Sequence, residues 1–160
     1  HQLETILHKK VPEWLTADGL LVLFEFVGAT RFQWPKAQLQ AANAVLQSIP
    51  KRYRTKIGSG AVKKRIYRPG TWRMRINDPS ESIRSADIMP LVHQWYSTLE
   101  EKQVAGSLLQ LVFQDIAHHF VEPDQGASKW LHYAFEQEDQ YTQYTGQSDF
   151  IFGVYQWKGD

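Results

Sequence analysis

Residues 20–27 read Leu-Leu-Val-Leu-Phe-Glu-Phe-Val, an almost unbroken apolar run in a chain of 160 residues. The turn-forming cluster at residues 16–19, Thr-Ala-Asp-Gly, precedes it. A short run of aliphatic and aromatic residues bounded by a turn signal is typical of a strand that is buried on both faces. We therefore predict that residues 20–27 form the central strand of a sheet, with Glu25 near an end where it can reach water or a partner.

Helical spacing appears on both sides of this run. Pro35 suits the first turn of a helix, and the apolar stripe Leu39, Ala42, Leu46 and Ile49 continues that helix to Pro50. Further helices are predicted over residues 2–8, 88–102 and 104–121, the second of them with Asp87 as its cap.

Two segments have the character of β-hairpins. Residues 61–77 alternate in polarity around the turn signal Arg68-Pro69-Gly70-Thr71, and residues 130–157 carry aromatic runs around a polar centre. Residues 130–140 fit a helix as an alternative. Together these patterns predict an α+β fold, with a mostly antiparallel sheet made from strand 20–27 and the two hairpins, and with three or four helices packed on it. We expect one globular domain over residues 1–160, excised from a larger protein because the chain starts at His1 without a methionine.

Charge is strongly segregated along the chain. Residues 51–77 hold ten basic and no acidic side chains, whereas residues 78–160 hold four basic and thirteen acidic ones. Segregation of this kind indicates a polyanionic partner or a complementary protein surface.

The register of the first hairpin decides which cations share a face. A three-residue loop at residues 69–71 separates charged from apolar side chains, with Lys64 and Arg68 as misfits on the inner face. The inner face then holds Val62, Ile66, Trp72, Met74 and Ile76. The outer face holds Lys63, Arg65, Tyr67, Arg73 and Arg75.

Cations that face one another across strands repel, so such a face needs an anion. A phosphate backbone supplies one, and Tyr67 could stack on a base. The chain is therefore predicted to be a non-catalytic nucleic-acid-binding domain, for DNA or RNA, whose track is extended by Lys51, Arg52, Arg54 and Lys56, with Tyr53 as a second ring. Three alternatives stay open: the acidic C-terminal half covers this face, the face is merely solvated, or it docks on an acidic protein surface, including another copy in an oligomer or larger assembly.

A second pattern raises the question of a metal-dependent hydrolase or nuclease. In a helix over residues 104–121 and just beyond, four side chains with metal-ligating chemistry would share one face: Asp115, His118, His119 and Glu122. Carboxylate and imidazole can hold a divalent metal that activates water. The favoured interpretation is structural, because histidines in the last turn of a helix interact favourably with its dipole and charged residues there are ordinary solvated surface.

Composition and the absence of known motifs exclude several other classes of protein and of active site. The chain has no cysteine, which excludes disulfides, a zinc ribbon and a thiol nucleophile, and it has no phosphate-binding loop or nucleophile-elbow motif. We expect no cofactor. Because no apolar run is long enough to cross a bilayer core of about 30 Å, we expect a soluble protein without a membrane partner. The absence of cysteine favours a reducing compartment, so we expect a cytoplasmic location.

Overall fold

The computed structural model describes residues 2–70 and 82–159. The chain divides into two compact units, each assembled from segments that are distant in the sequence. Unit 1 comprises His1–Gln33, Pro69–Val104 and Ser148–Asp160, and unit 2 comprises Trp34–Arg68 and Ala105–Gln147. One globular domain over residues 1–160 stays a prediction.

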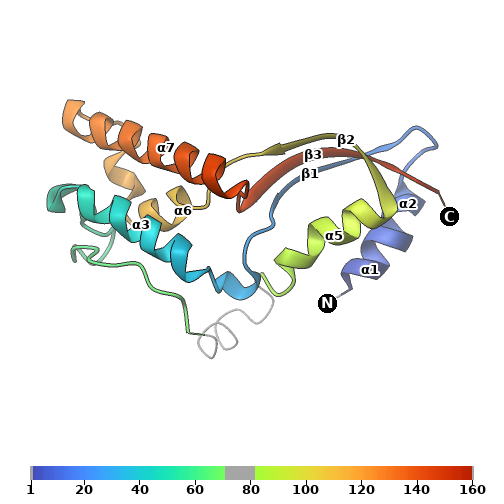
Figure 1. Cartoon of the computed structure of the whole chain (residues 1–160), viewed down its shortest axis with the longest axis horizontal. Helices are drawn as coiled ribbons and strands as arrows, with labels where there is room; N and C mark the ends of the chain where they lie inside the picture. Colours follow the sequence, from blue (N-terminus) through green and yellow to red (C-terminus); the bar gives the residue numbers. More distant parts are fainter. Residues whose placement is uncertain (1, 71–81, 160) are drawn as a thin grey trace. The chain divides into compact units, whose positions relative to one another are not determined.

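Unit 1 contains an antiparallel sheet in which β3 runs between β1 and β2 (Figure 1). The strands are β1 (Leu20–Phe26), β2 (Tyr96–Gln103) and β3 (Phe150–Trp157). In the β1–β3 register Leu20 lies opposite Gln156, and Phe26 lies opposite Phe150. Helices combined with an antiparallel sheet confirm the predicted α+β class.

Strand β1 confirms the predicted strand, but its predicted central position is wrong. β3 has a neighbour on each side, whereas β1 is an edge strand. Leu20, Val22 and Phe24 on one face of β1 are exposed, while Leu21 and Leu23 on the other face pack into the core. Only one face of this apolar strand is therefore buried, not both faces as predicted.

The covered face of the sheet packs on two helical segments of unit 1. The first runs through α1 (Leu3–Thr5), the π-helical η1 (Ile6–Lys10) and α2 (Val11–Trp14), and the second is α5 (Ser85–Trp95). Leu7, Val92, Tyr96 and Tyr155 form the buried cluster, and the Tyr96 hydroxyl donates to the Leu7 carbonyl at 2.6 Å. Gly153 makes room for the Tyr155 ring, because a Cβ at this position would lie 2.1 Å from the Tyr155 hydroxyl oxygen.

The two helices predicted after residue 87 are shorter than expected. α5 ends at Trp95, and residues 96–103 become β2 instead of continuing the helix to residue 102. Pairing with β3 overrides the helical spacing, and the β-bulge between Thr98 and Glu100 leaves Leu99 exposed. The helix predicted over residues 104–121 is reduced to α6 (Leu109–Phe113) and a 3-10 turn, η4 (Ala117–His119).

The second predicted hairpin is wrong over its first half. Residues 125–145 form α7 (Gln125–Thr145), in agreement with the helical alternative, and only β3 is extended. The Asp124 carboxylate caps α7 by accepting from the Ala127 N–H at 2.6 Å. Gly146 ends it in the left-handed region, with φ of 65°.

In unit 2 the predicted helix after Pro35 is confirmed as α3 (Lys36–Ser48). It packs with α6 and α7 (Figure 1), and Ala42, Leu46, Val112 and Ala134 are buried among them. Two further 3-10 turns are η2 (Thr30–Phe32) in unit 1 and η3 (Lys51–Arg54) in unit 2. Within residues 2–70 and 82–159, no helix has the length and apolarity needed to cross a membrane.

The first predicted hairpin is not formed by its described half. Residues 61–70 belong to no strand, and an isolated antiparallel bridge joins Val62 to Thr55. The other half of that hairpin, residues 71–77, lies outside the described residues.

Candidate nucleic-acid interface

Residues 64–68 run in an irregular segment beside α3, and side chains of α3 replace the missing strand partner. The Asn43 amide donates to the Ile66 carbonyl at 3.0 Å, and its oxygen accepts from the Ile66 N–H at 2.8 Å. The Gln47 amide donates to the Lys64 carbonyl. These bonds satisfy backbone groups that a sheet would otherwise satisfy.

The spacing of these contacts follows from elementary geometry. Asn43 and Gln47 are four residues apart on a helix, which is about 6 Å of rise. Their partners Ile66 and Lys64 are two residues apart in the segment, which is about 6.6 Å in an extended chain. The match keeps the segment antiparallel to α3, and Ile66 is buried within unit 2. Sequence analysis missed both amides, and their four-residue spacing on an amphipathic helix is the signal that could have revealed them.

Pinning the segment in this way leaves a basic and aromatic surface, which we define as Lys64, Arg65, Tyr67 and Arg68. All four side chains are exposed, and Tyr67 is 71% exposed. The Arg65 guanidinium carbon lies 5.5 Å from the Tyr67 ring centroid. Arg68 is anchored by its Nε, which donates to the Trp34 carbonyl at 2.7 Å. Arg65 and Tyr67 are exposed, as expected for the outer face, although the described half of the hairpin that would define this face is not formed; Lys64 and Arg68, expected on the inner face, are exposed as well.

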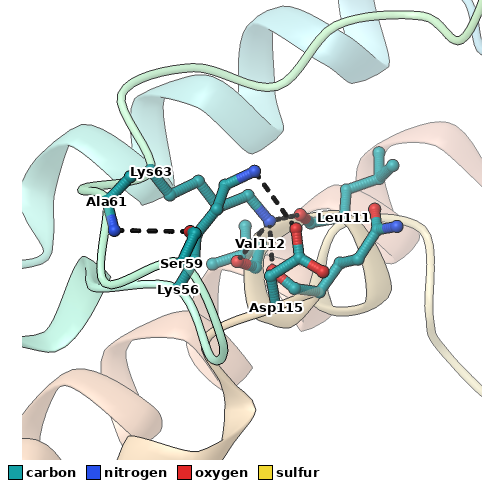
Figure 2. A network of polar contacts seen from close by, with 8 residues as sticks. Lys56, Ser59, Ala61, Lys63, Leu111, Val112 and Asp115 are labelled. Carbon is teal, nitrogen blue, oxygen red and sulfur yellow. Dashed lines mark hydrogen bonds and ion pairs between the residues drawn. The ribbon is translucent and has the colours of Figure 1, made fainter.

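Lys63 is the largest departure from the predicted face. Instead of pointing outward it is 5% exposed, and Figure 2 shows its ammonium group turned to the end of α6. Lys63 Nζ donates to three carbonyls, those of Leu111 at 2.8 Å, Val112 at 3.2 Å and Gln114 at 2.6 Å. Leu111 and Val112 belong to the last turn of α6 and Gln114 is its C-cap, and carbonyls at this end of a helix lack intrahelical partners, so they can hold a buried cation.

Burial changes the acidity of this ammonium group. Desolvation lowers the pKa of Lys63 to about 8, against the opposing attraction of the Asp115 carboxylate. Lys63 therefore has a structural position in unit 2, and its Nζ is not available to a phosphate.

The upstream track is only partly exposed. Lys51 and Arg52 face solvent, but Tyr53 and Arg54 are buried. Arg54 Nη1 donates to the Gln47 side-chain oxygen at 3.0 Å. The Tyr53 hydroxyl donates to the Asp124 carboxylate at 2.8 Å, and burial raises the pKa of Tyr53. Tyr53 consequently cannot serve as the second stacking ring that the sequence suggested.

Acidic residues of unit 2 neutralise little of the positive charge on residues 51–68. Lys56 Nζ lies 3.2 Å from an Asp115 carboxylate oxygen. Within the described part of unit 2, no other ion pair joins residues 51–68 to a carboxylate. Arg73 and Arg75, the remaining predicted contacts, lie outside the described residues.

The predicted metal ligands do not share a helix face, because the helix ends before Asp115 and that residue has φ of 66°. The Asp115 carboxylate turns to Lys56, and His119 Nε2 lies 2.7 Å from the Thr55 hydroxyl. The His118 and His119 rings lie 4.0 Å apart and are tilted by 39°, while Glu122 is exposed. Among the described residues, no cluster of three or more histidine and acidic side chains has metal-binding geometry.

Comparison with known proteins adds no family to this geometry. The chain matches no protein-family model, no curated protein and no solved structure.

Proposed function

We propose that this chain binds nucleic acid through the basic and aromatic surface Lys64, Arg65, Tyr67 and Arg68. The observation that carries the proposal is the exposed Tyr67 ring, with the Arg65 guanidinium carbon 5.5 Å from its centroid and the exposed Arg68 next to it in the sequence. Cations follow a phosphate backbone, and an exposed ring offers a platform on which any base can stack.

The way in which the segment is held favours this function. Its backbone is bound by Asn43 and Gln47, so the side chains are presented from a fixed chain and not from a free loop. Fixing the chain before binding lowers the entropy lost on association. Ten basic and six acidic side chains in unit 2 give a field that attracts a polyanion.

The test is fluorescence anisotropy of labelled single-stranded and duplex DNA and RNA, titrated with the whole chain at several salt concentrations. We expect the logarithm of the association constant to fall linearly with the logarithm of salt, with a slope of about −0.7 for each phosphate neutralised on a single strand. Tyr67→Ala should weaken single-strand binding about tenfold, because base stacking is lost.

Lys64→Glu with Arg65→Glu should lower affinity by more than tenfold and flatten the salt dependence. Lys9→Glu with Lys10→Glu is the matched control, since it makes the same net change in charge on exposed residues of unit 1. An equal loss of affinity in both double variants would show that only the net charge of the chain matters, and it would contradict the proposed surface. An absence of binding at low salt would also overturn the proposal and would favour an acidic protein surface as the partner.

A further inference from the structure

The outer edge of β1 carries hydrogen-bonding groups whose direction follows from its pairing with β3. The Val27 N–H donates to the Asp149 carbonyl at 2.8 Å, and the same register continues along the strand. In an antiparallel pair alternate residues bond to the partner strand, so Leu21, Leu23 and Glu25 bond to β3. The N–H and C=O groups of Leu20, Val22 and Phe24 consequently point away from β3, at the open edge.

The same three residues also expose their side chains. Leu20 is 45% exposed, Val22 is 56% exposed and Phe24 is 65% exposed. Among the described residues, no hydrogen bond to their backbone groups is formed at this edge. An extended edge with large apolar side chains readily pairs with another strand.

The opposite edge of the sheet has the protection that β1 lacks. β2 contains a β-bulge next to Leu99 and a charged run at Glu100, Glu101 and Lys102. Bulges and charges of this kind prevent strand addition in native sheets. The sequence Leu-Leu-Val-Leu-Phe of β1 has neither a charge nor a proline.

The open edge also has a defined end. The Phe26 N–H donates to the Glu25 side-chain oxygen Oε1 at 2.9 Å, so this donor is already used. Among the described residues, the edge positions that keep both an unused N–H and an unused C=O are therefore Leu20, Val22 and Phe24, with Val22 at their centre, while Phe26 keeps only its C=O. An antiparallel pair with twofold symmetry about Val22 would satisfy every one of these groups.

We propose that a second copy of this chain pairs with β1, strand to strand and antiparallel, with Val22 opposite Val22 of the second copy. Leu20 then lies opposite Phe24 of the other copy, and each of these pairs exchanges two hydrogen bonds. The pairing joins two sheets into one and brings together two apolar strips. It depends on unit 1 alone and is independent of the proposed nucleic-acid binding.

The register agrees with the charges and sets the expected strength. Glu25 lies opposite Gly19 of the second copy, so the two Glu25 carboxylates do not face each other. A stable interface buries about 800 Å² on each partner, which is more than two five-residue edges provide. We therefore expect a reversible dimer that forms with increasing concentration and does not weaken with added salt, because apolar contacts and backbone hydrogen bonds hold it.

Sedimentation velocity of the whole chain over a range of concentrations tests the pairing. Val22→Lys and Val22→Glu should each abolish the dimer, because like charges would meet across the symmetry axis. An equimolar mixture of the two variants should restore it as a heterodimer. Leu99→Lys makes a matched change on the protected edge of β2 and should leave the dimer intact. A monomer at every concentration, a dimer that dissociates with salt, or no restoration in the mixture would overturn the proposal.

Cross-linking provides a second test that does not require the fold to accept a charged residue at position 22. The chain has no cysteine, so a single introduced thiol reports only on its own position. Hydrogen-bonded antiparallel neighbours have Cα atoms about 5.5 Å apart, which is within disulfide range. Val22→Cys should oxidise to a covalent dimer faster than Phe24→Cys, whose counterpart lies several residues away. Equal or reversed rates would contradict the register.

Discussion

Lys63 shows how one residue of a basic run can serve the interior of the protein. Its neighbours Lys64 and Arg65 face solvent, whereas the Lys63 ammonium binds the carbonyls that end α6. The apolar stem of a lysine is long enough to carry its charge to such acceptors. Three consecutive basic residues therefore have different roles, since Lys63 is structural and Lys64 and Arg65 face solvent.

This burial predicts an alkaline rise in stability. The pKa of Lys63 is about 8 in the folded chain, below its ordinary value of 10.5, so the unfolded chain binds more protons between these limits. The free energy of unfolding should then increase with pH in this window, by about 1–2 kcal/mol from pH 8 to 9.5. Urea unfolding followed by tryptophan fluorescence measures it.

In Lys63→Met the rise should be absent, while Lys64→Met, an exposed neighbour, should retain it. Measurement stops at pH 9.5 because burial raises the pKa of Tyr53, Tyr96 and Tyr155, and the unfolded chain loses those phenolic protons first above pH 10. A rise of the same size in both methionine variants would show that another group causes it.

At the scale of elements, α6 is a short helix stabilised by buried charge at both ends. Glu138 of α7 is almost fully buried, and its carboxylate accepts from the N–H groups of Ser107 at 2.8 Å, Leu108 at 2.6 Å and Leu109 at 2.9 Å. Lys63 occupies the other end. A carboxylate at the N-terminus and an ammonium at the C-terminus both complement the helix dipole.

We expect Glu138→Gln to destabilise unit 2 by about 1–3 kcal/mol, because the amide removes the charge and one of its acceptor oxygens from buried N–H groups. Hydrogen exchange of the Leu108 and Leu109 amides should accelerate together with the loss seen in urea unfolding. Glu136→Gln changes an exposed carboxylate on the same helix and should stay within about 0.5 kcal/mol of the parent chain. Equal stability of the two variants would disprove the capping role.

Several elements could be predicted from sequence because their signals are local. The stripe Leu39, Ala42 and Leu46 repeats at helical spacing within thirteen residues of α3. β2 could not be predicted in this way, because its polar residues become a strand only through pairing with β3. The candidate site divides in the same manner, since the exposure of Tyr67 agrees with alternation while the burial of Lys63 depends on α6.

At the scale of the whole molecule, the two proposals concern different units. The basic and aromatic surface belongs to unit 2, whereas the open edge of β1 belongs to unit 1. The formal net charge of +1 conceals this division, because unit 2 has an excess of basic side chains and unit 1 has an excess of acidic ones.

The two activities should therefore separate by mutation. Val22→Lys should abolish the dimer and change oligonucleotide affinity by less than about twofold when measured below the dimerisation range. Tyr67→Ala should weaken oligonucleotide binding and leave the sedimentation profile unchanged. Anisotropy and sedimentation of the same preparations provide the comparison, and loss of both properties in either variant would show that the surfaces are coupled.

The sequence by itself determined the α+β class, the strand at residues 20–26, helix α3 and the concentration of cations after Pro50. These features depend on composition and on contacts between residues close in the chain. The tertiary structure alone decided that β1 is an edge strand, that residues 125–145 form a helix and that Lys63 is buried. Each of those outcomes depends on a partner that is distant in sequence or on competition between two local preferences, and burial on folding selects between them.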